Sequence, residues 1–166
     1  MDLLKTLQKE FQNESITTRK MLERLPEDKY DWKPHDKNMT LRQLATHIAE
    51  LPNWFKVVYT TEELDFAVEP YNPPVIDKTD ELIRYFEESL SEGMKYLDKM
   101  NDSEFNKMWT LKSGDQIYSH TTKTECVWMT YCQIVHHRAQ LGVYLRLLDI
   151  PIPGVYGPSA DDQQMM

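Results

Sequence analysis

Apolar side chains recur at three- and four-residue steps along most of this chain, which places them on one face of a helix. The pattern predicts four helices, over residues 3–25, 40–58, 77–100 and 122–148. No repeat or low-complexity block divides the 166 residues, so a single domain over residues 1–166 is expected. The sequence therefore predicts an all-α fold in which the four helices form a bundle.

The connection between the second and third predicted helices is long and contains Pro70, Pro73 and Pro74. A helix of ~20 residues is only ~30 Å long, so this segment could return along the whole bundle. An antiparallel neighbour would need only a short turn. We therefore expect a crossover and an up-down-down-up bundle, the alternative being a functional loop over one end. A small hairpin around Gly114 is also expected before the fourth helix.

Three residues predict local features of the helices. Pro52 lies inside the second helix and would clash with the carbonyl of Ile48, so a kink or short break is expected close to His47. Gly93 falls on the apolar stripe of the third helix, where another backbone could approach or room could remain. Glu14 interrupts the stripe of the first helix, which marks either a functional acid or a polar end of the bundle.

Charge and composition exclude several classes of function. Nineteen Lys and Arg residues against 27 Asp and Glu residues give a net charge of −8, with no basic cluster, so nucleic acid is not an expected partner. The N-terminus does not resemble a signal peptide, and no segment reaches the ~20 apolar residues of a membrane span. Cys126 and Cys132 would point to different faces of one helix, so they cannot bridge each other. A cytoplasmic protein is the simplest interpretation.

Two histidines on different helices are predicted to point into the core. His47 shares a helical face with Leu44 and Leu51, and His137 shares one with Leu141. Neutral imidazole is a common ligand for zinc, nickel and iron, so the two residues are a candidate metal pair. The alternative is that each is a hydrogen-bonded core residue.

Three further side chains could belong to such a site. Gln133 lies one turn before His137 on the same face, although an amide oxygen is a weaker ligand than imidazole. Glu50, three residues after His47, could be a ligand, an acceptor behind the ligands, a general base or a solvated charge. His120 precedes the fourth helix and either reaches a site at that end or remains in solvent.

The fourth predicted helix is apolar on a second face as well. His136 lies on that face with Cys132, Val143 and Leu147. A helix with two apolar faces is either central in its bundle or buried against a partner. The pattern favours a homodimer with His136 and Cys132 near the interface, the alternative being that the chain itself covers this face.

Three segments carry a resemblance to a known family. The stretches "LPEDKYDWKP", "LRQLATHIAELPNWF" and "HHRAQLGVYLRLLDIPIPGVYGPSADD" occur in this order and are similar to motifs of the DinB-like family. The resemblance implies an up-down-down-up four-helix bundle, dimers in many members and a divalent-metal site of three histidines. His47 matches the first of these ligands and His137 the last, whereas Gln133 occupies the middle position.

The substitution at Gln133 leaves three outcomes open. The amide oxygen could ligate a metal with reduced affinity, Glu50 or His136 could compensate, or the metal could be lost. Relatives in the superfamily include thiol-dependent S-transferases and isomerases. The resemblance therefore implies a metal-dependent enzyme, with a low-molecular-weight thiol, a small electrophile and no assigned catalytic residue. The alternative is a non-catalytic dimeric helical protein, or a small-molecule binder, that has lost the metal.

Overall fold

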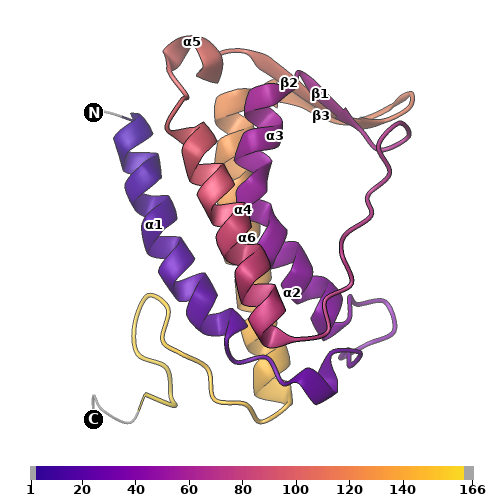
Figure 1. Ribbon diagram of the computed structural model, residues 1–166, viewed down its shortest axis with the longest axis vertical. Helices are drawn as coiled ribbons and strands as arrows, with labels where there is room; N and C mark the ends of the chain where they lie inside the picture. Colours follow the sequence, from indigo (N-terminus) through magenta and orange to yellow (C-terminus); the bar gives the residue numbers. More distant parts are fainter. Residues whose placement is uncertain (1–2, 163–166) are drawn as a thin grey trace.

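The computed structural model describes residues 3–162, in which long helices pack side by side beneath a small sheet (Figure 1). The helices are α1 (Leu3–Leu22), α2 (Leu41–Glu50), α3 (Trp54–Thr60), α4 (Thr79–Leu97), α5 (Asp102–Phe105) and α6 (Lys123–Leu147). The strands are β1 (Glu63–Asp65), β2 (Met108–Ser113) and β3 (Gln116–Thr122). Single 3-10 turns cover Glu27–Lys29 and Leu51–Asn53. None of the described helices is long and apolar enough to cross a membrane.

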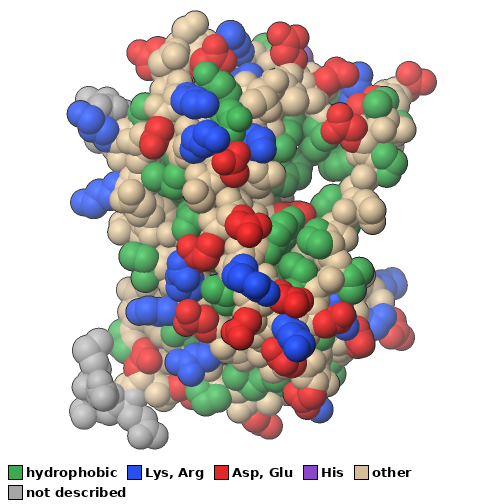
Figure 2. Space-filling model, in the orientation of Figure 1, with side chains coloured by type: hydrophobic (Ala, Val, Ile, Leu, Met, Phe, Trp, Pro, Cys, Tyr) green, Lys and Arg blue, Asp and Glu red, His purple; other side chains and the backbone are tan. Residues whose placement is uncertain are grey.

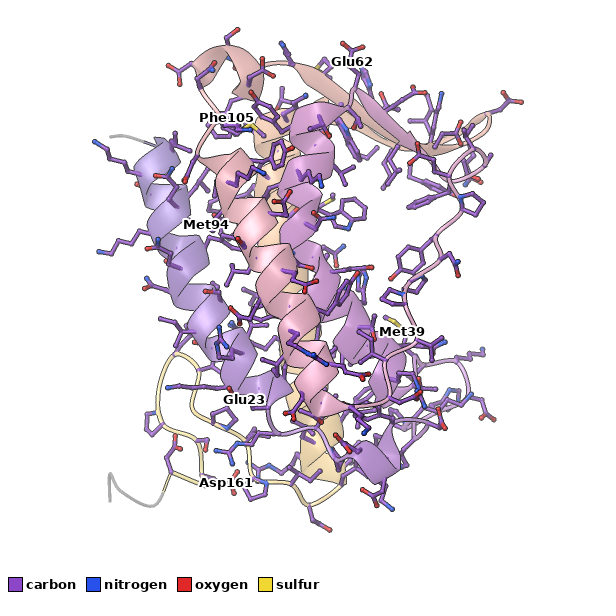
Figure 3. The ribbon with its side chains drawn as sticks, viewed as in Figure 1. Glu23, Met39, Glu62, Met94, Phe105 and Asp161 are labelled. Atoms are coloured by element: carbon purple, nitrogen blue, oxygen red, sulfur yellow. The ribbon has the colours of Figure 1, made fainter. Side chains whose placement is uncertain are left out.

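The long connection between α3 and α4 determines which helices are neighbours. Both α1 and the α2–α3 pair contact α4 and α6, which places α1 diagonally opposite α2 and α3. In Figure 1, α1 and α6 run in one direction, and α2, α3 and α4 run in the other. The segment 61–78, called the crossover below, starts beside Glu62 at the sheet end and descends along the outside of the molecule (Figure 3).

The prediction of an all-α fold was wrong, because the chain also forms a three-stranded mixed sheet. The expected hairpin around Gly114 is present as antiparallel β2 and β3, and β1 adds to β2 in parallel, with Leu64 opposite Leu111. Gly114 has a φ of +57°, and its N–H donates to Asp65 Oδ1 at 2.9 Å. Three residues are too few to show the alternating pattern of a strand. β1 forms because it pairs with β2, not because of its local sequence.

Hydroxyl caps begin the two helices that carry the candidate histidines. Thr40 accepts a hydrogen bond from the Gln43 N–H, and the Gln43 side chain accepts one from the Thr40 N–H. Thr122 and Glu125 form the same reciprocal pair at the start of α6. Each pair satisfies donors that a helix terminus leaves free, so the start of each helix is fixed.

Glu14, which interrupts the apolar stripe of α1, is part of a buried ion pair. Its carboxylate lies 2.5 Å from Arg138 Nη1 on α6, and both residues are almost fully buried. Arg138 also donates to Thr18 Oγ1, and the Tyr156 hydroxyl donates to Glu14 Oε1 at 2.8 Å. A buried charge needs such partners, so Glu14 joins α1, α6 and the C-terminal segment.

The expected break near Pro52 is confirmed. The α2 helix ends at Glu50, the turn Leu51–Asn53 follows, and α3 begins at Trp54. Gly93 of α4 packs directly against this turn, because a Cβ built on Gly93 would lie 2.2 Å from the carbonyl oxygen of Pro52. The glycine therefore allows the close backbone approach that its place on the stripe predicted.

Substitution of Gly93 by alanine should destabilise the fold. The added methyl group would force the Pro52 turn away from α4, and overpacking of this kind costs about 1–3 kcal/mol. Gly142→Ala on α6 is the matched control, because its Cβ would meet only side-chain atoms at 3.6 Å and 3.9 Å. The control should be neutral or up to about 1 kcal/mol more stable. Urea unfolding measures both, and equal free energies for the two variants would contradict this packing.

Candidate metal-binding site

The two predicted inward histidines meet between α2 and α6. The ring centroids of His47 and His137 are 4.8 Å apart, with an interplanar angle of 77°. Both side chains are partly buried. Two imidazoles on one tetrahedral zinc, with Zn–N bonds of ~2.0 Å, would have centroids ~5 Å apart. The prediction that these rings converge is confirmed, and their spacing fits a shared ion.

A hydrogen bond at Nδ1 orients each imidazole. His47 Nδ1 lies 2.7 Å from Glu50 Oε1, and His137 Nδ1 lies 2.9 Å from Gln140 Oε1. An oxygen acceptor at Nδ1 favours the tautomer that carries its proton there, so Nε2 keeps the lone pair that a metal requires. Burial is the main cause that lowers the pKa of His137 below 6.5, which also favours the neutral ring.

Tyr71 of the crossover contacts both Glu50 and His47. Its hydroxyl donates to Glu50 Oε1 at 2.5 Å, and its ring lies edge-on to His47, with centroids 6.3 Å apart. Burial, followed by the contact with Glu50, raises the pKa of Tyr71 far above 10, so the phenol remains a donor. Glu50 is therefore the hydrogen-bond acceptor for Nδ1 of His47, which is one of the roles that the sequence left open.

Gln133 lies on the same small cavity as His47. The cavity has a volume of about 120 Å³, and its other lining residues are Leu51, Trp54, Leu111, Met129 and Thr130. Among residues 3–162, no group of three His, Cys, Asp or Glu side chains is placed to hold a metal. His137, which contacts His47, is not among the residues that line this cavity. Two imidazoles and one amide would fit a metal less strongly than three imidazoles.

The other candidate residues do not complete this group. His136 is exposed on the outer side of α6, although its ring centroid is 5.0 Å from that of His137. His120 lies on β3, where Nδ1 is hydrogen-bonded to Thr110 Oγ1 at 2.9 Å. Neither residue lines the cavity that His47 shares with Gln133.

Two contributors to the site were missed in the sequence. Gln140 follows His137 by three residues, as Glu50 follows His47. This spacing could have predicted the hydrogen bond between Gln140 and His137. Tyr71 had no such signal, because it lies in an irregular proline-rich segment without periodicity.

These features define a helix-dominated protein with a histidine-based candidate metal site between two helices and a small sheet at one end. The chain matches the model of the DinB family over residues 1–165 and belongs to that family. No curated protein sequence matches it significantly.

Solved structures show the same fold at low sequence identity. A DinB-like protein from Bacillus subtilis has a TM-score of 0.69 and 16% identity, over 90% of this chain and 96% of its own. A protein assigned to the DinB family from Exiguobacterium sibiricum has a TM-score of 0.69 and 21% identity, over 97% of both chains. A mycothiol-dependent maleylpyruvate isomerase has a TM-score of 0.61 and 15% identity, over 84% of this chain and 60% of its own. These likenesses establish the fold alone.

The lowered pKa of His137 predicts a dependence of stability on pH. The unfolded chain binds a proton at this residue near pH 6.5, whereas the folded chain binds it only at lower pH. Unfolding is therefore favoured as the pH falls below 6.5. His137→Gln should lose less stability between pH 7.5 and 5.5 than the wild type, by urea unfolding in the presence of a chelator. An equal loss in both proteins would contradict the shift.

Proposed function

We propose that this protein is a metal-dependent enzyme in which His47, His137 and Gln133 hold a divalent transition metal such as zinc, nickel or iron. The observation that carries the proposal is the convergence of two imidazoles, each oriented at Nδ1 by an oxygen acceptor. The DinB-like superfamily is generally associated with metals, which agrees with this donor set.

The proposed chemistry is the transfer of a low-molecular-weight thiol to a small electrophile, or an isomerisation that uses such a thiol. A bound metal would lower the pKa of a coordinated thiol, so that the nucleophilic thiolate forms at neutral pH. The mycothiol-dependent isomerase with a similar fold supports a thiol as cosubstrate. Glu50 and Gln140 would keep the imidazoles in place, and the apolar residues Leu51 and Leu111 would limit water in the cavity.

Gln133 supports a second candidate function. With an amide in place of a third imidazole, and no group of three strong ligands among the described residues, the site would bind metal weakly. The alternative is therefore a non-catalytic small-molecule binder that keeps the cavity without the ion. Metal content separates the two candidates.

Metal analysis of protein purified without a nickel column tests the site. We expect a transition metal in the wild type and at least about a tenfold loss of affinity in His47→Ala and His137→Ala, because each removes an imidazole. His136→Ala is the control, because its side chain points outward and should leave metal content unchanged. Gln133→His should raise affinity by at least about tenfold by restoring a third imidazole.

Two results would argue against the proposal. A wild-type protein with less than about a tenth of an equivalent of metal, and no zinc uptake by calorimetry, would favour the binder that lacks an ion. A metal that remains in both alanine variants would show that these histidines do not hold it.

The outer face of α6 supports a homodimer. Trp128, Val143 and Leu147 are each about 60% exposed there, beside the exposed Cys132 and His136. We propose that two copies of the chain bury these faces against each other, since exposed apolar patches of this kind mark interaction surfaces.

Val143→Glu should convert the dimer to a monomer, because it places a charge within the apolar face. Ile16→Glu is the matched control, since Ile16 is a branched apolar residue of α1 that is 57% exposed, against 58% for Val143. Sedimentation velocity at several concentrations measures the assembly. A wild type that remains monomeric at high concentration, or equal effects of the two substitutions, would contradict an interface on α6.

A further inference from the structure

A second cavity lies between the crossover and the helices, next to the candidate metal site. It has a volume of about 240 Å³. In Figure 2, hydrophobic side chains gather around the hollow between the crossover and the helices, on the right of the view. The lining residues come from α2, α3, the crossover (including its strand β1) and α4: Glu50, Trp54, Val57, Leu64, Phe66, Glu69, Pro70, Tyr71, Asn72, Pro73, Pro74 and Tyr85.

Aromatic rings contribute four of these lining side chains. Trp54 belongs to α3, Phe66 and Tyr71 to the crossover, and Tyr85 to α4, so the rings enter the cavity from three separate segments. Burial raises the pKa of Tyr85, and its phenol therefore remains neutral. Neutral aromatic rings present negative faces, and a cation within ~6 Å of such faces is attracted to them.

The charged residues that line the cavity are both acids, Glu50 and Glu69, with no Lys, Arg or His among the lining residues. The nearby base Lys112 is already paired, with Nζ 2.9 Å from Glu63 and 3.8 Å from Asp65. An anionic ligand would therefore meet two carboxylates of like charge, whereas a cation would be attracted by them.

Glu50 has one carboxylate oxygen that its network does not use. The hydrogen bonds with His47 and Tyr71 both involve Oε1. Within the part of the chain that the structure describes, Oε2 has no hydrogen-bond partner, although the side chain is only 12% exposed. A carboxylate oxygen that is free to accept, at a cavity wall without a basic side chain, favours a cationic partner that can donate to it or lie against it.

We propose that this cavity binds a small organic cation, a primary or quaternary ammonium group on a compact apolar body. The ammonium group lies against Glu50 and the aromatic rings, and Glu69 adds negative charge at the exposed edge. Because Trp54 lines both cavities and Glu50 contacts His47, the bound cation lies beside the histidine pair. Binding of this cation does not depend on the proposed metal-dependent chemistry.

Two pairs of probes that differ in charge but little in shape test this proposal. Choline is compared with the neutral 3,3-dimethylbutan-1-ol, and butylamine with butan-1-ol, by calorimetry on the full-length protein. We expect at least one cation to bind about tenfold more tightly than its neutral counterpart, which is the scale of a desolvated cation–π contact. Equal affinities within both pairs would overturn the proposal.

Substitutions then locate the binding site. Tyr85→Leu and Glu69→Gln should each weaken binding of the cation at least about threefold, whereas Tyr85→Phe, which keeps the ring, should retain it. Glu88→Gln is the matched control, because Glu88 is an exposed acid of α4 outside the cavity. If Tyr85→Leu and Glu69→Gln bind the cation as Glu88→Gln does, the cation does not occupy this cavity.

The same titrations on metal-stripped protein and on His137→Ala separate this inference from the proposed function. We expect the preference for the cation to persist in both, because no lining residue of the cavity is a proposed metal ligand. Cation binding without any metal uptake by the wild type would support a small-molecule binder and leave the inference intact. If both samples bind the cation no more tightly than the neutral probe, the cation site is not independent of the metal site, and the inference is overturned.

Discussion

The close contact between Gly93 and the Pro52 carbonyl fixes the geometry on which both cavities depend. The proline ends α2, and the glycine lets the resulting turn lie against α4, so the helix is broken without leaving the core. His47 and Glu50 come just before this turn, and Trp54 comes just after it. A continuous helix would place Trp54 differently relative to Glu50. One local break therefore sets the positions of a candidate ligand, its acceptor and a shared cavity wall.

Buried imidazoles are costly unless their polar atoms have partners, and here each receives one from its own helix. Glu50 and Gln140 follow His47 and His137 by three residues, so formation of α2 and α6 itself orients the rings. Burial then favours the neutral form of His137. Both rings are thus held in one orientation by their own helices, whatever Gln133 contributes.

Helical phase was sufficient to predict α1, α4, α6 and the broken helix α2–α3, although not the short α5, and it also gave the inward direction of His47 and His137 and the break at Pro52. It was insufficient wherever a partner far away in sequence decides the structure. β1 is a strand only because β2 lies beside it, so the all-α prediction was wrong. Glu14 looked anomalous because its partner Arg138 is 124 residues away. Tyr71 reaches Glu50 from a segment without periodicity. Local pattern determines faces and breaks, whereas pairing across the fold requires the assembled chain.

The two carboxylate oxygens of Glu50 connect these observations. A carboxylate that is 12% exposed in a chain of net charge −8 needs compensation, and the protein supplies two donors to Oε1 alone. His47 and Tyr71 both use Oε1, so Oε2 remains free, among the described residues, to accept from a further donor. The aromatic walls around it lack any basic residue. A cation from solution would place a compensating charge beside Glu50, in the cavity that shares Trp54 with the cavity of His47. The ligand chemistry therefore follows from Glu50 and the aromatic walls rather than from the histidines.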